Sequence, residues 1–473
     1  MKGRRKLMNR ESQSIFEDMP VIQAILKLAV PTVIGQIILV IYNMADTYFI
    51  GLTGNDAKIT AVTVCMPAFM FLSAISNLFG VGGSATVSRA LGRQRTGRAG
   101  NASAFALYGC LTVTLLYSLG AWLLIDPFVD LLGGTHALVH ANAVEYLKIT
   151  VVLGGLGTAT AALLGHLVRA EGRSMHASIG IMMGGILNIV LDPLFMFVIL
   201  PPGRETMGAA IATALSNAIS CLYYVILLIW LRHRQTALTF RFDKNAMLEG
   251  TFREIIMTGL PACLMTLCEN ISYAVLDHLM AAEGMAFQAG IGVAKKINML
   301  AHCIVRGIAQ GVLPLIAYNY AARNYSRMKK VILHSSLLSV GLSFVTMVAF
   351  ILFADNLVAV FINTTGDSLI FGAKFLQILA VGCPFSAFAY AIISFFQAIG
   401  QNLKSFCLAV LRKGSLDIPL MFVMNVIWPR FGIVSATPIA DIICCTTAVY
   451  LFVTCLHQLK NTETHTKLKP SGT

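Results

Sequence analysis

The stretch "IGIMMGGILNIVLDPLFMFVIL" (179–200) is apolar almost throughout, yet it carries Asn188 and Asp192 one helical turn apart. It is long enough to cross a bilayer as a helix, which takes about 20 residues. An Asp in the middle of such a helix costs about 2.5–3.5 kcal/mol on insertion scales. The stretch therefore predicts a transmembrane helix in which neighbouring groups offset that cost or the protein uses the carboxyl group.

The composition of the whole chain agrees with this interpretation. Of the 473 residues, 57% are hydrophobic and 12% are charged, whereas a soluble domain has about 25% charged residues. Alternating strand patterns are absent, and a lipid-exposed backbone has to be hydrogen-bonded internally. We predict an all-α integral membrane protein with twelve transmembrane helices, at about 22–50, 58–88, 99–125, 143–166, 175–200, 207–231, 254–282, 289–320, 331–354, 371–397, 404–428 and 433–457.

The two halves of the chain are related by an internal repeat at an offset near 228. "NIVLDPLF" (188–195) meets "GSLDIPLMF" (414–422), and Pro31 meets Pro261. Each half has an even number of spans, so this is a parallel repeat about an axis along the membrane normal. We therefore predict two pseudo-symmetric six-helix lobes, in the order N-terminal tail 1–20, N-lobe 21–232, linker 233–253, C-lobe 254–458 and C-terminal tail 459–473.

The net charge of +13 is spread unevenly over the predicted loops. Most of the Lys and Arg residues lie on one side, and only Lys58, Arg204, Lys374 and Arg430 lie in the loops of the other side. By the positive-inside rule, both termini and the linker are cytoplasmic. We expect a multi-pass protein of the plasma (inner) membrane, in contact with the lipid bilayer. The positive charge is a topology signal, so no nucleic acid is expected as a partner.

No pattern in the chain indicates an enzyme. The 11 Cys and 10 His show no metal-ligand spacing, and no nucleophile–base arrangement is evident. A GxxxxGK[ST] motif is also absent, so ATP is not expected to drive the protein directly. We predict a carrier with no cofactor.

Four motifs resemble those of the multidrug and toxic compound extrusion (MATE) family. They are "GVGGSATVSRALGRQRTGRA" (80–99), the stretch 169–195 followed by "GAAIAT" (208–213), the stretch 307–330 and the stretch 397–420. The resemblance implies a two-lobe antiporter that exports cationic or amphipathic organic compounds in exchange for Na⁺ or H⁺. We expect a monomer. The alternative is a lipid-linked sugar flippase of the same superfamily, although such flippases tend to have more helices.

The resemblance also implies a cation or proton site in the N-lobe, formed by Asp46, Asn188, Asp192 and Thr213. Asn188 and Asp192 share one helix face. Two carboxylates in a low-dielectric site repel each other, so a shared proton or a Na⁺ at Asp46, Asn188 and Asp192 would stabilise them. The alternative is that these groups only hydrogen-bond between helices, at about 0.6 kcal/mol each.

A second candidate site lies in the C-lobe. Glu269 and Asp277 are eight residues apart, so they should share one face of the seventh helix. In one branch of the family such a Glu binds an ion, but that branch's partner Asp on the tenth helix is not evident here. Arg412 and Lys413 lie too deep in the membrane to reach water easily, so each needs a carboxylate partner. Asp441 is a further candidate, and a plain salt bridge is the alternative.

Overall fold

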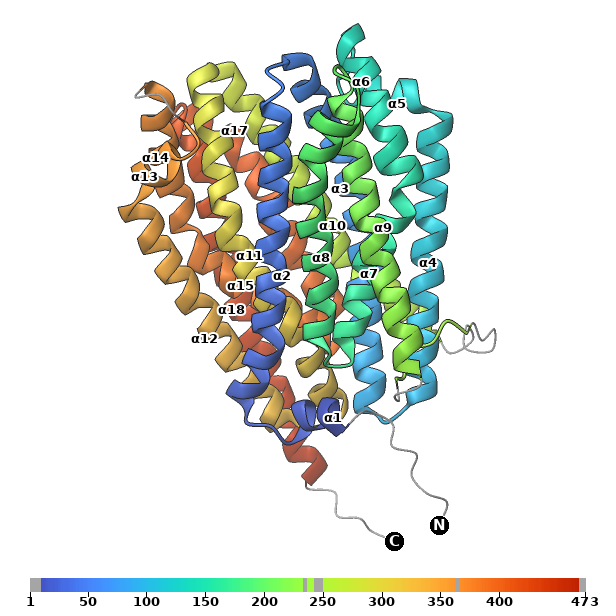
Figure 1. Ribbon diagram of the computed structural model, residues 1–473. Helices are drawn as coiled ribbons and strands as arrows, with labels where there is room; N and C mark the ends of the chain where they lie inside the picture. The colour runs from blue at the N-terminus through green and yellow to red at the C-terminus, as the bar shows by residue number, and fades with distance from the viewer. Residues whose placement is uncertain (1–9, 233–235, 242–249, 363–365, 468–473) are drawn as a thin grey trace.

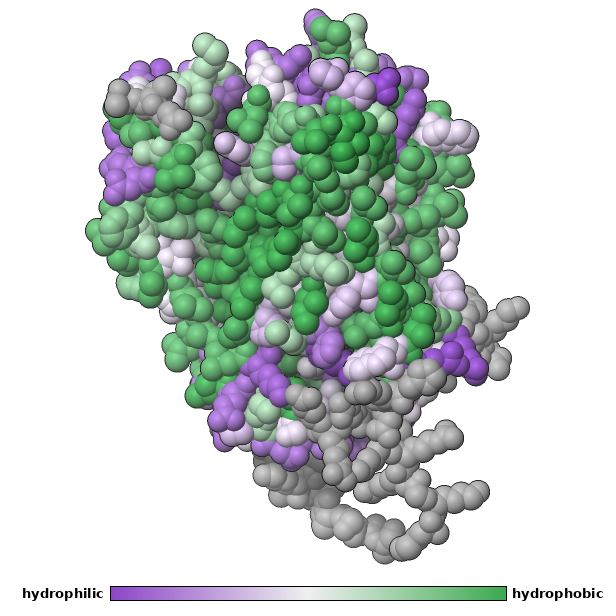
Figure 2. All heavy atoms as spheres, viewed as in Figure 1, coloured by the Kyte–Doolittle hydropathy of each residue, from purple (hydrophilic) through white to green (hydrophobic). Residues whose placement is uncertain are grey.

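The computed structural model describes residues 10–232, 236–241, 250–362 and 366–467, with side chains described from 12 to 459 within these ranges. Every element in this part of the chain is helical. The long helices lie side by side with their axes roughly aligned (Figure 1). A broad hydrophobic band covers the face shown in Figure 2, with hydrophilic residues at the two ends. Such a surface suits a bilayer, and the predicted all-α membrane fold is confirmed.

The N-lobe contains six transmembrane segments. Its elements are α2 (Val21–Gly51), α3 (Asp56–Gly92), α4 (Thr96–Leu123), the short α5 (Ile125–Leu131), the bent unit of α6 (Ala137–Leu147), η1 (Lys148–Leu153) and α7 (Gly155–Ala170), then α8 (Ser174–Pro193) with η2 (Leu194–Ile199), and α9 (Glu205–Arg232). Helix α3 starts at a polar cap, because the side chain of Asn55 accepts a hydrogen bond from the Ala57 amide at 3.0 Å.

The C-lobe repeats this plan. Its elements are α10 (Thr251–Glu283), α11 (Met285–Ala321), α12 (Tyr325–Leu352), the short α13 (Ala354–Ala359), the bent pair α14 (Asp367–Val381) and α15 (Cys383–Ile399), the unit of α16 (Asn402–Val410), η4 (Leu411–Ser415) and α17 (Asp417–Ile427), and α18 (Phe431–Lys467). In the described residues, nine helices are long and apolar enough to cross a membrane, and the two bent pairs raise the number to eleven. The remaining predicted span, 404–428, is the α16–η4–α17 unit.

Matching bends support the internal repeat. The fourth span of the N-lobe bends by 48° around Gly154, and that of the C-lobe bends by 44° around Gly382. These glycines are 228 positions apart, which is the offset of the sequence repeat. Each lies against the last span of its own lobe. A Cβ on Gly154 would come within 2.9 Å of Ala214, and one on Gly382 within 3.1 Å of Pro438. Glycine therefore permits the same close approach in both lobes.

The N-terminal region differs from the predicted tail. Residues 1–9 lie outside the described part, but α1 (Arg10–Glu17) is a helix, because Ile15 and Phe16 bury apolar side chains there. Phe16 stacks on Tyr318 with ring centroids 4.8 Å apart, and a Cβ on Gly172 would come within 3.0 Å of its ring. Helix α1 therefore contacts both lobes. The end of the bundle at which α1 lies is called the α1 end below (Figure 1).

Two helices extend past the limits predicted for the C-lobe. Helix α18 continues to Lys467, beyond the predicted end of the C-lobe at 458, and α10 begins at Thr251, just before the predicted start at 254. Within the predicted linker, residues 236–241 and 250–253 are described, and 233–235 and 242–249 lie outside the described part, as do 468–473 of the C-terminal tail.

Among the described residues, the hydrophobic core that joins the two lobes lies at the α1 end. One buried cluster there joins residues of both lobes, for example Leu28 and Ala85 of the N-lobe with Ile255 and Phe395 of the C-lobe. At the opposite end the two larger clusters each lie within a single lobe. The lobes are therefore packed together at the α1 end and have separate cores at the other.

Candidate ion-coupling site

Three neighbouring helices of the N-lobe bring the four predicted residues together. Helix α2 packs along α8, and α8 packs along α9. Asp46 lies on α2, Asn188 and Asp192 lie on α8, and Thr213 lies on α9. All four side chains are buried, with Asp192 fully inaccessible to solvent. We call these four residues the N-lobe cluster.

Hydrogen bonds within the N-lobe cluster leave three oxygen atoms unused. The Asn188 amide nitrogen donates to Asp192 Oδ1 at 3.3 Å and to Thr213 Oγ1 at 3.2 Å. Asp46 Oδ1, Asn188 Oδ1 and Asp192 Oδ2 are buried and accept no hydrogen bond within the described part of the chain. An unsatisfied buried acceptor costs about 1–3 kcal/mol, and more if it is charged.

The chemistry of these atoms suits a small hard cation or a proton. The three oxygens without a hydrogen bond belong to carboxylate or amide groups, and such oxygens bind hard cations. The cluster has no imidazole or thiolate group of the kind that transition metals prefer. Among the described residues, no Lys or Arg pairs with Asp46 or Asp192. The N-lobe cluster therefore holds two buried carboxyl groups that have no Lys or Arg partner among the described residues.

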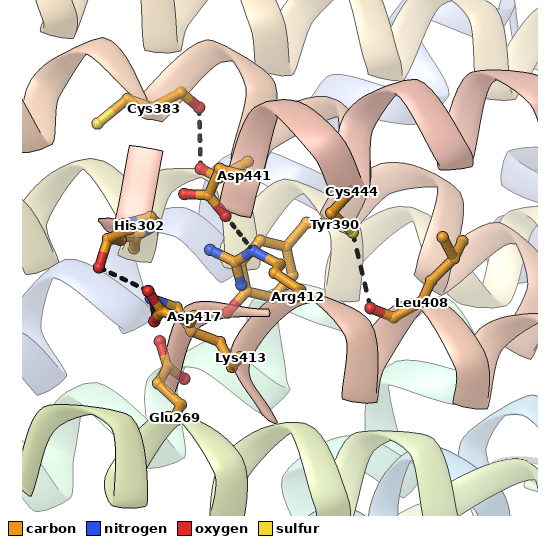
Figure 3. A network of polar contacts seen from close by, with 12 residues as sticks. Glu269, His302, Cys383, Tyr390, Leu408, Arg412, Lys413, Asp417, Asp441 and Cys444 are labelled. Atoms are coloured by element: carbon orange, nitrogen blue, oxygen red, sulfur yellow. Dashed lines mark hydrogen bonds and ion pairs between the residues drawn. The ribbon is translucent and has the colours of Figure 1, made fainter. Parts of the chain in front are cut away.

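The predicted charged residues of the C-lobe form ion pairs instead. Arg412 Nε donates to Asp441 Oδ1 at 2.8 Å (Figure 3). Arg306 Nη2 donates to Glu269 Oε2 at 2.8 Å. The Arg412 guanidinium lies 4.3 Å from the centre of the Tyr390 ring. Both Arg412 and Asp441 are buried. The salt-bridge alternative therefore describes this part of the C-lobe.

Lys413 pairs with Asp417, a residue that the sequence analysis did not single out. Lys413 Nζ lies 2.9 Å from Asp417 Oδ2, which also accepts a hydrogen bond from Ser272 at 2.6 Å. Thr437 donates to Asp417 Oδ1 at 2.9 Å. The signal was in the repeat itself, because Asp417 is the Asp of "GSLDIPLMF" that stands opposite Asp192. We call Lys413, Asp417, Ser272 and Thr437 the C-lobe cluster.

Asp277 and Glu269 were expected to belong to one site, but the structure places them apart, with different partners. Asp277 pairs with Lys295 of α11 and is about half exposed, whereas Glu269 is largely buried beside Arg306. Eight residues of helix separate the two carboxyls by about 12 Å along the helix axis, so sharing a face does not make them neighbours.

The lobes are sealed against each other at the α1 end by Arg89 of α3. Its guanidinium donates to the carbonyl oxygens of Gln397 and Ala398 in α15 at 2.9 and 3.1 Å. It also pairs with Glu254 of α10 at 3.1 Å. Close backbone contact adds to this seal, because a Cβ on Gly259 of α10 would overlap the Leu78 carbonyl group of α3. A rocking motion of the lobes would have to break these contacts.

Comparison with known proteins gives the same two-lobe division. The family model MatE matches residues 31–194 and again residues 261–423, one segment in each lobe. The multidrug export protein MepA of Staphylococcus haemolyticus (strain JCSC1435) is 27% identical over 447 residues, covering 94% of this chain and 96% of that protein. MepA of Staphylococcus aureus (strain N315) is 29% identical over 446 residues, with the same shares covered.

Solved structures agree in fold. A crystal structure of MATE in complex with MaL6 superposes with a TM-score of 0.88 at 23% sequence identity, covering 96% of this chain and 100% of that one. The family model matches most of both lobes. The bend in the fourth span of each lobe shows the same repeat in the structure. The chain belongs to the MatE family, the multidrug and toxic compound extrusion family that its motifs predicted.

Proposed function

We propose that this protein exports cationic or amphipathic organic compounds in exchange for Na⁺ or H⁺ bound at the N-lobe cluster. The observation that carries the proposal is the set of three buried oxygens without a hydrogen-bond donor, on Asp46, Asn188 and Asp192, among the described residues. Two buried carboxylates with no internal cation are costly to keep ionised. Binding of an ion would lower this free-energy cost. The ion-free and ion-bound states of the protein would then differ in stability.

The coupling follows from where these residues lie. Asp46 and Asp192 stand on the packed helices α2 and α8, so an ion bound between them would change the charge at the contact of the two helices. Helix α2 also packs on α11 of the C-lobe. A change in its position therefore reaches the contact between the lobes. Ion binding would favour the state that releases substrate, and by linkage substrate would disfavour the ion to the same extent.

The orientation in the membrane is part of the proposal. The loops at the α1 end carry the excess of Lys and Arg, so we place that end in the cytoplasm. The structure, with its lobes sealed at the α1 end, would then be closed to the cytoplasm. Opening the Arg89 seal would admit substrate from inside.

Two further points support export over the alternative function. The matching curated relatives are multidrug export proteins. A lipid-linked sugar flippase was expected to have more helices, and the spans of the described chain are accounted for by two lobes of six. No feature of the residues that the structure describes favours the flippase.

Transport by the purified protein in proteoliposomes tests the proposal. A cationic dye is loaded, and Na⁺ and pH gradients are imposed separately. We expect efflux to follow one of the two gradients and to be lost in Asp46→Asn. Asp130→Asn is the matched control, because it makes the same chemical change at an exposed residue of the same lobe. Dye efflux that continues at the same rate with neither gradient would refute antiport.

A further inference from the structure

The C-lobe cluster stands at the place that corresponds to the N-lobe cluster. Lys413 and Asp417 lie 225 positions after Asn188 and Asp192, with the same one-turn spacing. Thr437 stands opposite Thr213 in the aligned stretches "GIVSATPIAD" and "GAAIATALSN". In each lobe the hydroxyl of this Thr is hydrogen-bonded within the cluster, to Asn188 in the N-lobe and to Asp417 in the C-lobe. The repeat has therefore kept a carboxylate and a threonine at equivalent points of both lobes.

The two clusters differ in charge. The N-lobe has an amide, Asn188, where the C-lobe has the ammonium of Lys413. The N-lobe also has a second carboxylate, Asp46, fifteen residues after Pro31, whereas the residue fifteen after Pro261 is Leu276, which is buried and apolar. The N-lobe cluster thus has two carboxylates and no cation, and the C-lobe cluster has one carboxylate and one cation.

Lys413 satisfies the carboxylate that it faces. Both oxygens of Asp417 have partners: Oδ1 accepts from Thr437, and Oδ2 accepts from Ser272 and Lys413. Neither atom is among the unsatisfied buried groups of the described residues, in contrast to Asp192 Oδ2. Lys413 is itself buried, and its ammonium lies 5.5 Å from the centre of the Tyr273 ring. Tyr273 therefore adds a second, weaker contact to the same ammonium.

We infer that the C-lobe cluster is a second cation site, filled permanently by the Lys413 ammonium. Because this cation is covalently attached, it cannot be exchanged across the membrane. The C-lobe therefore contributes no coupling ion, and the exchangeable ions bind in the N-lobe alone. The claim that exchangeable ions bind in the N-lobe alone rests on the proposed function of the N-lobe cluster. The claim that Lys413 fills a cation site at Asp417 does not depend on that proposed function.

Removing the lysine tests the inference. Lys413→Asn gives the C-lobe the amide that the N-lobe has, and leaves Asp417 without its cation. Asp417 must then take up either a Na⁺ or a proton. The measurements are equilibrium binding of radiolabelled Na⁺ and the infrared C=O band of a protonated buried carboxyl group. We expect Lys413→Asn to gain one Na⁺ equivalent or one such band, and the gain to disappear in Lys413→Asn/Asp417→Asn.

Controls separate this inference from the proposed function. Lys413→Arg keeps a fixed cation and should gain nothing. Repeating the measurement in an Asp46→Asn/Asp192→Asn background removes both N-lobe carboxylates, so a C-lobe gain is visible whether or not the N-lobe binds an ion. A folded, monodisperse Lys413→Asn protein with neither signal would overturn the inference, as would a signal that survives Asp417→Asn.

A second measurement does not depend on the folding of any Lys413 variant. In Asp46→Asn/Asp192→Asn, the N-lobe has no carboxylate left in its cluster, and Lys413 is intact. We expect this protein to bind no Na⁺ within the membrane domain and to show no Na⁺-dependent transport. A remaining Na⁺ equivalent that is removed by changing Asp417 would show that the C-lobe exchanges its cation, which is the opposite of the inference.

Discussion

The N-lobe cluster and the C-lobe cluster occupy matching places in two lobes of the same plan, yet only the C-lobe cluster contains its own cation. In the C-lobe, Asp417 is paired with Lys413 and the neighbouring Asp441 with Arg412. In the N-lobe, Asp46 and Asp192 have no such partner, and each keeps a buried oxygen without a hydrogen bond among the described residues. A buried carboxylate with its own cation is already neutralised within the protein, whereas one without a cation can change state when an ion binds. The difference suggests that one lobe is built for rigidity and the other for exchange.

The largest expected effect is on stability and comes from the C-lobe. Arg412→Met should lower the free energy of unfolding by about 3–5 kcal/mol, because Asp441 is left buried and unpaired. Thermal unfolding in detergent measures this loss. The double variant Arg412→Met/Asp441→Leu should recover most of it, since an apolar pair replaces the ion pair without an isolated charge. A double variant as unstable as the single one would indicate that the pair has a role beyond charge compensation.

The next effect is on coupling and comes from the N-lobe. Asp192→Asn should keep the fold and most of the substrate affinity, because Asn preserves the shape of the side chain. Gradient-driven efflux should fall by roughly 5–150-fold, the range of a typical coupling free energy. Proteoliposome efflux and thermal unfolding are measured on the same preparation.

Efflux and thermal unfolding together show whether Asp192 has a role in coupling or a structural role. Loss of stability together with transport would favour the hydrogen-bonding alternative for the N-lobe cluster. Adding Asp46→Asn to Asp192→Asn should cost little more, because residues that act as a unit are not additive. Transport at the wild-type rate under both gradients would exclude Asp192 from coupling.

The sequence predicted the fold well because its signals are strong and repeated. Twelve apolar stretches, a biased distribution of basic residues and a repeat near 228 all point to two six-helix lobes. The N-lobe residues were found from family motifs, and the structure brings Asp46, Asn188, Asp192 and Thr213 together. Their role in coupling stays a prediction, since proximity alone does not show exchange.

The C-lobe was harder to predict because pairing depends on side-chain direction and depth. Arg412 and Lys413 are adjacent in sequence but reach different carboxylates, Asp441 and Asp417. Sequence spacing gives the face of a helix and not the partner across it. Helix α1 was also missed, because two apolar residues in a polar tail are too short a pattern to indicate a docked helix.

A smaller effect than that of Asp192→Asn is expected when the C-lobe arrangement is copied into the N-lobe. Asn188→Lys would place an ammonium next to Asp192, as Lys413 stands next to Asp417. Asp192 would then be paired permanently, while Asp46 stays free to bind an ion. We expect weaker coupling, with part of the gradient-driven efflux retained, and no loss of thermal stability. Asn188→Gln is the control, because it lengthens the side chain without adding charge. Wild-type ion dependence in Asn188→Lys would contradict the comparison between the lobes.

The smallest expected effect concerns Asp277, which lies in the C-lobe but outside its buried ion pairs. Asp277 pairs with Lys295 and is about half exposed, so solvent screens the interaction. Exposed ion pairs contribute about 0–1 kcal/mol, and Asp277→Asn should change thermal stability by no more than that, with efflux under either gradient close to wild type. Glu269→Gln, on the same helix but largely buried beside Arg306, is the matched comparison and should cost more. A strong loss of transport in Asp277→Asn would show that coupling depends on charge outside both clusters. The division into one exchanging and one fixed lobe would then fail.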